Sequence, residues 1–480
     1  MKICFVDPKG IHFGLNTGIG YIAAYFKKQY NLNEIKVFDF NNNTKNLDLR
    51  LKELCSYDLI GFSVKSSTKN SALEIATRIK NKNNILFAGG PHITIDGVNF
   101  IKKNEIFDFG IVGEGEIIAT QLLNALKTNE DRDNINGLVY RRGKDIIFTG
   151  NSYRNTNLDE LPFPDYSNFD SDEDGKIYNY PLVTSRGCPC LCTYCCVKGV
   201  MGKNWYARSV ENIIQELKEV KYKYKSTCFN IQDDNFTLNM DRAKKFCESL
   251  IREALDFKWS CPNGIRADKI DRELMGMMRQ AGCFGIAIGV ESGNEEEFKS
   301  IKKGESLEDV IRAVQIAREN KIWVFGNFII GLPNSSLESI RKSIKFAKKL
   351  KLESCIFNLL VPFPGTEILE WVKQNGKMLM NWEDGFTQGK NPKIVFETDN
   401  FTKEERLKAY CEANIKCNNY FAFIDEHETL LKNILNILKI IIKYDSFNIP
   451  AHILWVLKHF KRIILRIAGN KYSSFTISNN

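Results

Sequence analysis

The sequence predicts an α/β protein with two sheet-forming regions and a helical C-terminal region. Short apolar strands alternate with amphipathic helices over residues 1–145 and again over 181–395, which indicates parallel sheets covered on both faces. Residues 146–180 carry prolines and acidic residues with little periodicity and are interpreted as a linker. Residues 396–480 show helical patterns without strands. The predicted organisation is therefore a first domain over 1–145, a linker over 146–180, a second domain over 181–395 and a helical region over 396–480.

The composition is typical of a globular protein in a reducing compartment. Of the 480 residues, 43% are apolar and 26% are charged, which predicts a soluble protein of two or three domains. The opening "MKICFVDPKG" matches a buried strand better than a signal peptide, so we expect a cytoplasmic protein. Fourteen cysteines in that compartment favour metal binding or catalysis over disulfides.

The net charge of +9 is concentrated at the C-terminus. From Lys432 onward there are eight Lys or Arg and one acid, within the patterns "NILNILKIIIKY" and "HILWVLKHFKRIILRIAG". Two interpretations stay open: a basic helical cap over the preceding domain, or peripheral contact with an anionic membrane. Nucleic acid is not expected as a partner, because the rest of the chain lacks a basic groove with interleaved aromatic residues.

In the first region, glycine-rich turns follow two predicted strands. These turns read "AGGPH" (88–92) and "GEGE" (113–116). Ligands of parallel sheets bind at the carboxyl ends of strands, and glycine allows a ligand close to the backbone. The second region contains "TCFNIQD", "KWSCPNG", "FGIAIGVES", "WVFGNFIIGLP" and "SCIFNLLVPF", a succession that predicts a partial (β/α) barrel with its chemistry at the strand ends.

The stretch "SRGCPCLCTYCCVKG" holds five cysteines within nine positions. A single register, through Cys188, Cys192 and Cys195, gives the spacing C-x3-C-x2-C. Three thiolates on one loop can hold three irons of a cubane cluster and leave the fourth iron open. A zinc site with Cys190 or Cys196 as an extra ligand and a group of structural thiols are the alternatives.

The segment "CPCLCTYC", placed after the first predicted barrel strand, resembles the signature of radical S-adenosylmethionine (SAM) enzymes. The resemblance implies that Cys188, Cys192 and Cys195 bind a [4Fe–4S] cluster and that SAM chelates the open iron. It also implies that Tyr194 lies near the adenine of SAM. Cys190 and Cys196 do not belong to this pattern and are interpreted as small buried residues.

Three later segments match the same family in order. Asp233 and Asp234 in "FNIQDDNFT" stand where the family binds the SAM amino group, although a helix cap or a turn is the alternative. Arg266 in "PNGIRAD" is a candidate partner for a carboxylate. Glu291 and Ser292 in "GIAIGVESG" match the ribose-binding strand and are predicted acceptors for hydroxyl groups.

The first region resembles the Rossmann-like cobalamin-binding domain found in one branch of the radical SAM enzymes. The resemblance places a corrin ring on the strand ends, near Ser63, Gly89, Gly90, Pro91, His92, Gly113, Glu114, Gly115 and Glu116. The segment "LDELPFPDY" resembles the interdomain linker of that branch.

The histidine motif of classical cobalamin proteins, D-x-H-x-x-G, is absent. His12 follows Asp7 by five positions in "VDPKGIHFG". Because many members of the branch bind cobalamin with no histidine on cobalt, we expect this His-off mode, with a degenerate domain that binds no cobalamin as the alternative. His12 and His92 are interpreted as hydrogen-bonding loop residues.

The resemblance implies cleavage of SAM to methionine and a 5′-deoxyadenosyl radical, followed by cobalamin-dependent methylation of an unactivated carbon, as in class B radical SAM methyltransferases. Radical cyclisation, rearrangement or epimerisation without methyl transfer is the alternative reaction. A methylthiotransferase would need three more cysteines in the first region, which offers Cys4 and Cys55 only. An iron–sulfur sensor or scaffold is the non-enzymatic alternative. Expected partners are a small-molecule or lipophilic substrate and a reductant such as flavodoxin or ferredoxin.

Overall fold

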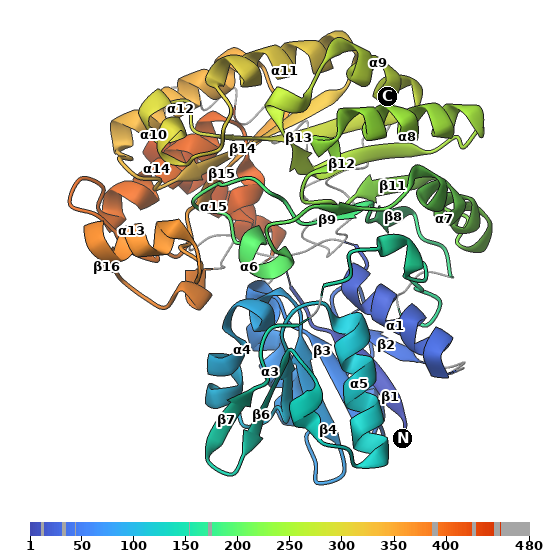
Figure 1. The fold of residues 1–480 in the computed structure, drawn as a ribbon. Coiled ribbons are helices and arrows are strands. Elements are labelled where there is room, and N and C mark those ends of the chain that lie inside the picture. Colours follow the sequence, from blue (N-terminus) through green and yellow to red (C-terminus); the bar gives the residue numbers. More distant parts are fainter. Residues whose placement is uncertain are drawn as a thin grey trace. The chain divides into compact units, whose positions relative to one another are not determined.

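The computed structural model describes residues 1–10, 14–30, 35–43, 45–152, 154–170, 175–385, 392–424, 429–445 and 452. His12 and most of the second basic pattern of the C-terminus therefore lie outside the described residues. The chain divides into two compact units, Met1–Gly187 with Val197–Ser226, and Cys188–Cys196 with Thr227–Asn480. Helices and strands alternate in both units, so the α/β fold class is confirmed (Figure 1).

The first unit is built on a seven-stranded sheet in the order β2-β1-β3-β4-β5-β6-β7. The neighbouring pairs from β2 to β5 are parallel, and the pairs β5/β6 and β6/β7 are antiparallel. The strands are β1 (Ile3–Asp7), β2 (Lys36–Asp39), β3 (Leu59–Ser63), β4 (Ile85–Gly89), β5 (Phe109–Ile111), β6 (Leu138–Arg142) and β7 (Asp145–Phe148).

Helices cover both faces of this sheet, as its apolar strands require. On one face, Phe26 of α1 packs edge-on against Phe5 of β1 at 5.8 Å between ring centroids. On the other face, Phe62 of β3 belongs to a buried cluster with residues of three helices. The helices are α1 (Thr17–Tyr30) and α5 (Gly115–Thr128) on the first face, and α2 (Leu47–Leu54), α3 (Lys69–Ile79) and α4 (Pro91–Lys103) on the second (Figure 1).

The antiparallel hairpin β6–β7 extends the predicted parallel sheet at one edge. Its loop has two residues between the paired Arg142 and Asp145, and Gly143 adopts φ 62° there. Such a short loop can join only antiparallel strands, because a parallel crossover needs a dozen or more residues. The composition of β6 and β7 resembles that of the parallel strands, so the sequence pattern alone did not reveal the change of direction.

The predicted linker lies along the edge of the first sheet. Asn168 accepts a backbone hydrogen bond from Val37 of β2 at 2.9 Å. The carboxylate of Asp170 accepts hydrogen bonds from Nε and Nη2 of the buried Arg50, both at 2.8 Å. The linker thus occupies backbone groups that an edge strand would otherwise expose. The domain bounds at 145, 180 and 395 stay predictions.

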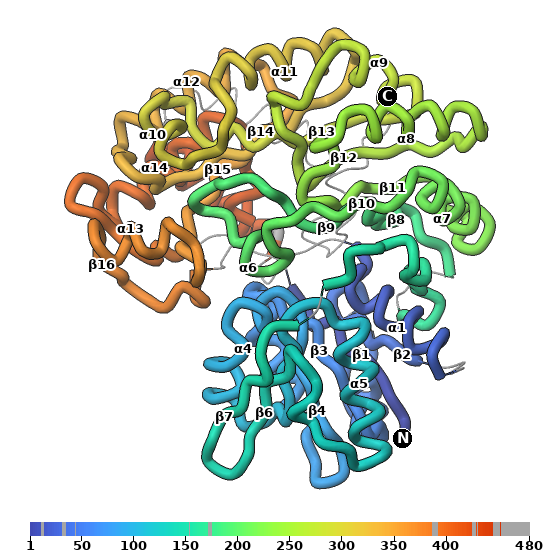
Figure 2. Tube along the Cα trace, in the orientation of Figure 1, coloured from blue at the N-terminus to red at the C-terminus, as the bar shows by residue number. Residues whose placement is uncertain are grey.

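The second sheet has six strands in the order β15-β14-β13-β12-β11-β8, and the neighbouring strands from β11 to β15 pair in parallel. Figure 2 follows the chain through this succession of strands and helices. The strands are β8 (Asn179–Leu182), β11 (Cys228–Ile231), β12 (Lys258–Ile265), β13 (Cys283–Glu291), β14 (Trp323–Ile330) and β15 (Ser354–Leu359), and short pairs are β9 (Ser185–Arg186) with β10 (Tyr206–Ala207) and β16 (Lys377–Met378) with β17 (Phe396–Glu397).

Amphipathic helices with polar caps connect these strands. Ser336 accepts a hydrogen bond from the Ser339 amide and begins α12, and Asp271 begins α9 in the same way. The helices are α6 (Val197–Met201), α7 (Val210–Lys223), α8 (Met240–Arg252), α9 (Arg272–Gln280), α10 (Glu295–Ser300), α11 (Leu307–Glu319), α12 (Leu337–Leu350), α13 (Glu367–Asn375), α14 (Lys403–Lys416) and α15 (Leu430–Asp445).

Along β14 and β15 of the second sheet, buried residues alternate with more exposed ones. Phe328 of β14 and Phe357 of β15 are buried and stack at 4.4 Å between ring centroids. Asn327 and Ile356 are register partners on the opposite face, where Ile356 is 42% exposed. Because alternate residues of a strand point to opposite faces, the face that carries Asn327 is the more open one.

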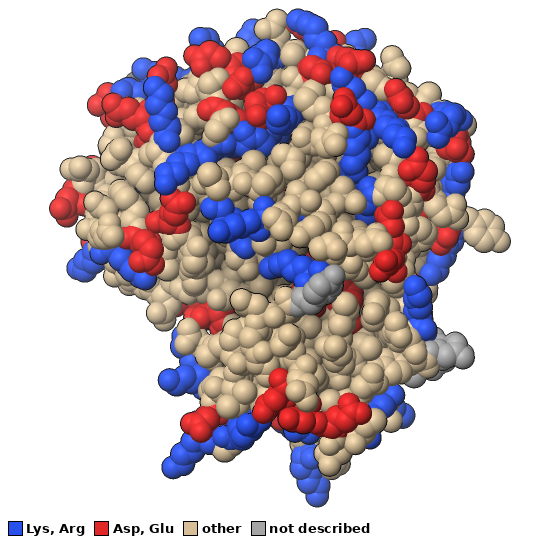
Figure 3. Space-filling view, viewed as in Figure 1, with Lys and Arg blue, Asp and Glu red and all other residues tan. Residues whose placement is uncertain are grey.

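The predicted C-terminal helices are present in the described part of the tail. On α15, Leu431, Leu435 and Ile442 are exposed beside lysines of the same helix. The structure describes no helix that is both long and apolar enough to cross a bilayer. The cap and membrane interpretations of the tail both stay predictions. Elsewhere, the face shown in Figure 3 intersperses Lys and Arg with Asp and Glu.

The edge of β15 is occupied by a side chain of α14. Asn414 is fully buried, its Oδ1 accepts from the Phe357 amide at 3.2 Å, and its Nδ2 donates to the Phe357 carbonyl at 3.1 Å. The amide group thus makes the pair of hydrogen bonds that a neighbouring strand would make.

We expect Asn414→Leu to destabilise the protein by about 1–3 kcal/mol, because it leaves a buried backbone donor and acceptor unpaired. Urea unfolding followed by circular dichroism measures the change. Lys408→Ala on the exposed face of the same helix is the matched control, and equal stabilities of the two variants would contradict the role given to Asn414.

Candidate active site

The cysteine loop of residues 187–196 is held by backbone hydrogen bonds on both sides. The Thr193 amide donates to the Ile301 carbonyl at 3.0 Å, and the Thr193 carbonyl accepts from the Ile368 amide at 3.1 Å. Within the loop, the Cys195 amide donates to the Cys192 carbonyl at 3.2 Å, which closes a tight turn. The motif thiols are therefore presented from a fixed backbone.

All five cysteines of the loop are partly exposed free thiols, unlike the buried Cys261 and Cys283 of the neighbouring strands. The pKa of Cys188 is lowered, mainly by a hydrogen bond from Cys190 and against the effect of burial. Burial raises the pKa of Cys192. Cys188 thus combines partial exposure with a stabilised thiolate, which suits a ligand of iron.

The described residues include no group of three or more His, Cys, Asp or Glu side chains placed to hold one metal ion. A cubane cluster binds each thiolate on a different iron, so its ligands need not converge on one point. The donor type, the partial exposure and the rigid loop of Cys188, Cys192 and Cys195 fit a [4Fe–4S] cluster. The alternative of a zinc site with Cys190 or Cys196 as an extra ligand stays untested. Both thiols are partly exposed, which corrects their interpretation as buried residues.

Asp233 and Asp234 follow β11 after one intervening residue, Gln232, at the carboxyl edge of the second sheet. Asp233 is 2% exposed, and Asp234 is partly exposed. Asp234 contributes to the raised pKa of Cys196, whose main cause is burial. Two carboxylates therefore stand at the strand end beside the cysteine loop, as the sequence predicts.

Arg266 lies just after β12 and contacts the cysteine loop. Its Nη1 approaches Cys190 Sγ at 3.2 Å and donates to the Lys303 carbonyl at 2.8 Å. Its Nε is 2.8 Å from Asp268 Oδ1 and 3.4 Å from Glu305 Oε1. Arg266 thus already has two carboxylate partners within the chain, and its predicted contact with a SAM carboxylate stays a prediction.

Glu291 ends β13 with a left-handed backbone, at φ 60°. Its Oε1 accepts from Tyr194 Oη at 2.7 Å and is 3.2 Å from Lys303 Nζ. Lys303 is 8% exposed and lies 3.3 Å from Glu305 Oε2. Although burial lowers it, the pKa of Lys303 is raised by Glu291 and Glu305.

Gly289 makes room for this ion pair. A Cβ at this position would lie 2.8 Å from Lys303 Nζ. The sequence analysis did not identify Lys303 or Glu305, although both follow the predicted ribose-binding strand within "IKKGES". A lysine in a lysine-rich segment gave no signal that its side chain is buried.

Ser292, next to Glu291, is fully buried and faces a different set of partners. Its Oγ donates to Glu297 Oε2 at 2.6 Å and lies 3.2 Å from Ser343 Oγ. Glu297 and Ser343 are each 1% exposed. The structure therefore separates Ser292 from the group that surrounds Glu291, and its predicted contact with SAM stays a prediction.

In the first unit, three predicted positions lie together at the carboxyl edge of the parallel strands. Ser63 ends β3, Gly89 ends β4, and the two are register partners. Gly90 follows with φ 99°, and a Cβ there would lie 2.9 Å from the Val64 carbonyl oxygen. All three are partly exposed, and the two glycines carry no side chain, so this edge lets a ligand such as a corrin ring come close to the backbone.

Pro91 and His92 begin α4. His92 is 1% exposed, and its Nδ1 lies 3.0 Å from Ser66 Oγ. Its ring also packs edge-on against Phe100 at 5.6 Å between centroids. The imidazole is therefore part of the interior of the first unit.

The predicted "GEGE" segment is largely engaged by Arg186. Glu116 lies 2.7 Å and Glu114 3.3 Å from the guanidinium of Arg186. Although burial lowers it, the pKa of Arg186 is raised by Glu116 and Glu114. Gly113 remains partly exposed after β5, and Gly115 is the first residue of α5. The sequence analysis missed Arg186, which directly precedes the cysteine loop in "SRG".

Asn16 is a further residue whose role could not be recognised from the sequence. It is 5% exposed, and its Nδ2 donates to Asp7 Oδ1 at 2.8 Å and to Ser63 Oγ at 2.9 Å. Asn16 thereby fixes the predicted cofactor-binding residue Ser63. Its position immediately before α1 is typical of a helix cap, which gave no indication of this contact.

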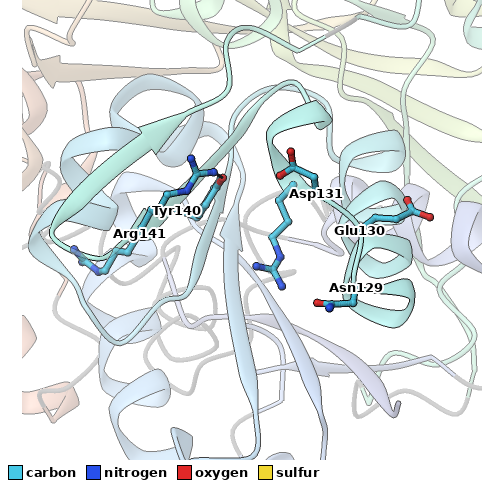
Figure 4. A pocket seen from close by; sticks show the side chains of 7 residues that line it. Asn129, Glu130, Asp131, Tyr140 and Arg141 are labelled. Atoms are coloured by element: carbon cyan, nitrogen blue, oxygen red, sulfur yellow. Dashed lines mark hydrogen bonds between the residues drawn. The ribbon is translucent and has the colours of Figure 1, made fainter.

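A pocket of about 370 Å³ lies at the other edge of the first sheet. Tyr140, which lines it, is the register partner of Phe109, the first residue of β5, so the pocket is near the amino ends of the parallel strands. None of the predicted site residues contributes to it. The lining residues are Asn129, Glu130, Asp131, Arg132, Tyr140, Arg141 and Arg142 (Figure 4).

Comparisons with known proteins match both units. Residues 12–123 match the family model of the B12 binding domain, and residues 182–347 match that of the radical SAM superfamily. An uncharacterized methyltransferase from Pyrococcus horikoshii is 29% identical over 433 residues, which cover 88% of this chain and 90% of that protein.

An anaerobic magnesium-protoporphyrin IX monomethyl ester cyclase from Synechocystis is 28% identical over 288 residues, which cover 56% of this chain and 55% of that protein. Among solved structures, the radical SAM methyltransferase TsrM from Kitasatospora setae, with cobalamin and a [4Fe–4S] cluster bound, has a similar fold. Its TM-score is 0.71 at 16% identity, with 86% of this chain and 91% of that chain covered.

The two family models match in the order that the sequence analysis predicted, and the cysteine loop lies within the second match. Together the domains imply a [4Fe–4S] cluster, SAM and cobalamin as cofactors. The chain therefore carries a B12-binding domain followed by a radical SAM domain.

Proposed function

We propose that this protein is a cobalamin-dependent radical SAM methyltransferase that methylates an unactivated carbon of a small or lipophilic substrate. The observation that carries the proposal is the fixed loop of Cys188, Cys192 and Cys195, which stands beside strand-end carboxylates in a chain that also has a B12-binding domain. The similarity to the Pyrococcus and Kitasatospora proteins, both named as methyltransferases, supports the proposal.

When bound, a reduced cluster supplies the electron that cleaves SAM to methionine and a 5′-deoxyadenosyl radical, and cobalamin carries the methyl group. In this proposal, the three motif cysteines hold the cluster. Asp233 and Asp234 can only accept hydrogen bonds when ionised, which suits the cationic ammonium group of SAM. Lys303 keeps the carboxylate of Glu291 in place as an acceptor for ribose hydroxyls.

The proposed cobalamin has no histidine on cobalt. His92 supports this, because its side chain is buried and forms a hydrogen bond with Ser66. Ser63, Gly89 and Gly90 are instead the groups that the strand ends present to a ligand. A one-electron donor such as flavodoxin or ferredoxin completes the proposed system.

Radical cyclisation without methyl transfer is the second candidate. The observation that favours it is the similarity to the Synechocystis cyclase, which matches 56% of this chain. The same cysteine loop and the same B12-binding domain would serve either reaction, so the two candidates differ in the fate of the SAM methyl group.

An anaerobic assay tests the proposal. Protein reconstituted with iron, sulfide and hydroxocobalamin is freed of unbound cofactor and given SAM and a strong reductant. Formation of both S-adenosylhomocysteine and 5′-deoxyadenosine supports the methyltransferase. 5′-Deoxyadenosine alone favours cyclisation or rearrangement. If neither product forms although the cluster is present, the proposed enzymatic function is wrong and a sensor or scaffold replaces it.

We expect Cys192→Ala to abolish cluster assembly, because it removes one of three ligands, whereas Cys190→Ala leaves the cluster in place. Iron and labile sulfide per chain, together with the visible absorption spectrum, measure both variants. Equal losses in the two variants would show that the register of the motif is wrong.

We expect Glu291→Gln to weaken SAM binding by about tenfold or more, because the substitution replaces a charged carboxylate acceptor by a neutral amide. The buried Lys303 then keeps Glu305 as its remaining carboxylate partner among the two. Isothermal titration of the reconstituted protein with SAM measures the change. Glu296→Gln on the exposed face of α10 is the matched control and should bind SAM like the wild type.

We expect the electron paramagnetic resonance spectrum of bound cob(II)alamin to show no nitrogen superhyperfine splitting from His92, because His92 lies in the interior. His92→Phe should retain cobalamin after gel filtration. Splitting that is present in the wild type and lost in this variant would show that His92 ligates cobalt.

A further inference from the structure

We propose that Asn235 is a positioning residue that donates an N–H···S hydrogen bond to the Cys188 thiolate and thereby raises the reduction potential of the iron–sulfur cluster. This inference rests on the proposed function, because it assumes that Cys188 is a cluster ligand. It concerns a residue that neither the cysteine motif nor the predicted SAM-binding residues include.

The geometry places one amide between two sulfurs. Asn235 Nδ2 is 3.6 Å from Cys188 Sγ and 3.9 Å from Cys190 Sγ. The shorter of the two contacts thus falls on the sulfur that belongs to the C-x3-C-x2-C motif.

The backbone that carries Asn235 is anchored in the core of the second unit. The next residue, Phe236, is 1% exposed and packs edge-on against Phe246 at 5.9 Å and Trp259 at 6.1 Å. Trp259 is fully buried in β12. Because Phe236 cannot move without disturbing this aromatic cluster, the amide of Asn235 is held in one place.

Asn235 is itself 1% exposed, so little water competes for its amide group. In such surroundings a hydrogen bond has more electrostatic effect than in water. The loop after β11 reads Asp233, Asp234, Asn235. The two aspartates offer acceptors, and only the asparagine side chain can donate to a thiolate.

The consequence for the cluster follows from charge. A one-electron donor adds one negative charge to the cluster and its thiolates, and a hydrogen-bond donor beside a ligating sulfur stabilises that reduced form more than the oxidised form. Hydrogen bonds to the sulfurs are among the factors that set cluster potentials. Asn235 therefore makes the cluster easier to reduce by a physiological donor.

The test is the midpoint potential of the reconstituted full-length protein without SAM, measured by an EPR-monitored redox titration. We expect Asn235→Leu, which keeps the volume but cannot donate, to lower the ratio of reduced to oxidised cluster at a fixed potential by about tenfold, equivalent to ~59 mV for one electron. Iron and sulfide content should stay at the wild-type level, which separates this effect from a loss of folding.

Asn263→Ala is the matched control. Asn263 is exposed on the same edge of the sheet, and its side-chain amide donates to the Gln232 carbonyl at 2.8 Å rather than to a cysteine sulfur. Its potential should equal that of the wild type. An Asn235→Leu protein with full cluster content and an unchanged potential would overturn the inference while leaving the proposed function intact.

If Asn235→Leu fails to assemble a cluster, the wild type decides. Pulsed EPR of the reduced cluster in protein labelled with ¹⁵N-asparagine should show a coupled ¹⁵N nucleus, and its absence overturns the inference. A wild-type protein that assembles no [4Fe–4S] cluster under reconstitution overturns the proposed function and this inference together.

Discussion

The geometric constraint of parallel strands determines where this protein can carry out chemistry. Strands that run in the same direction bring their carboxyl ends to one edge of the sheet. In the first unit this edge holds Ser63 and Gly89, and in the second it holds Asp233, Arg266 and Glu291. Residues far apart in the sequence meet because of the strand direction, and the intervening helices bury the faces that make the sheets stable.

A chain of opposite charges stabilises the site of the second unit. Asp268, Arg266, Glu305, Lys303 and Glu291 follow one another with each basic group between two carboxylates. Buried ions are costly unless they are paired, so each member depends on its neighbours. The left-handed backbone of Glu291 and the missing Cβ of Gly289 are local features that this arrangement requires.

The sequence was informative where a pattern is local. The spacing of Cys188, Cys192 and Cys195 and the apolar runs before the strand ends predicted the candidate site and the fold class. Contacts between distant residues were not predictable, because Arg186 with Glu116, or Lys303 with Glu291, meet only in the folded chain.

Adjacent residues were also hard to separate from the sequence. Glu291 and Ser292 are neighbours in one motif, but the side chain of Ser292 enters a buried network with Glu297. The antiparallel hairpin β6–β7 was missed because its strands resemble the parallel strands in composition. The roles of the predicted site residues stay predictions.

The contact between Asn414 and Phe357 has a consequence for synthesis of the protein. The backbone of β15 is complete well before residue 414 leaves the ribosome, and until then the Phe357 amide and carbonyl have no partner from α14. An open edge of this kind can pair with a strand of another nascent chain. Chains that end before α14 should therefore aggregate during translation, even though every strand of the sheet has been made.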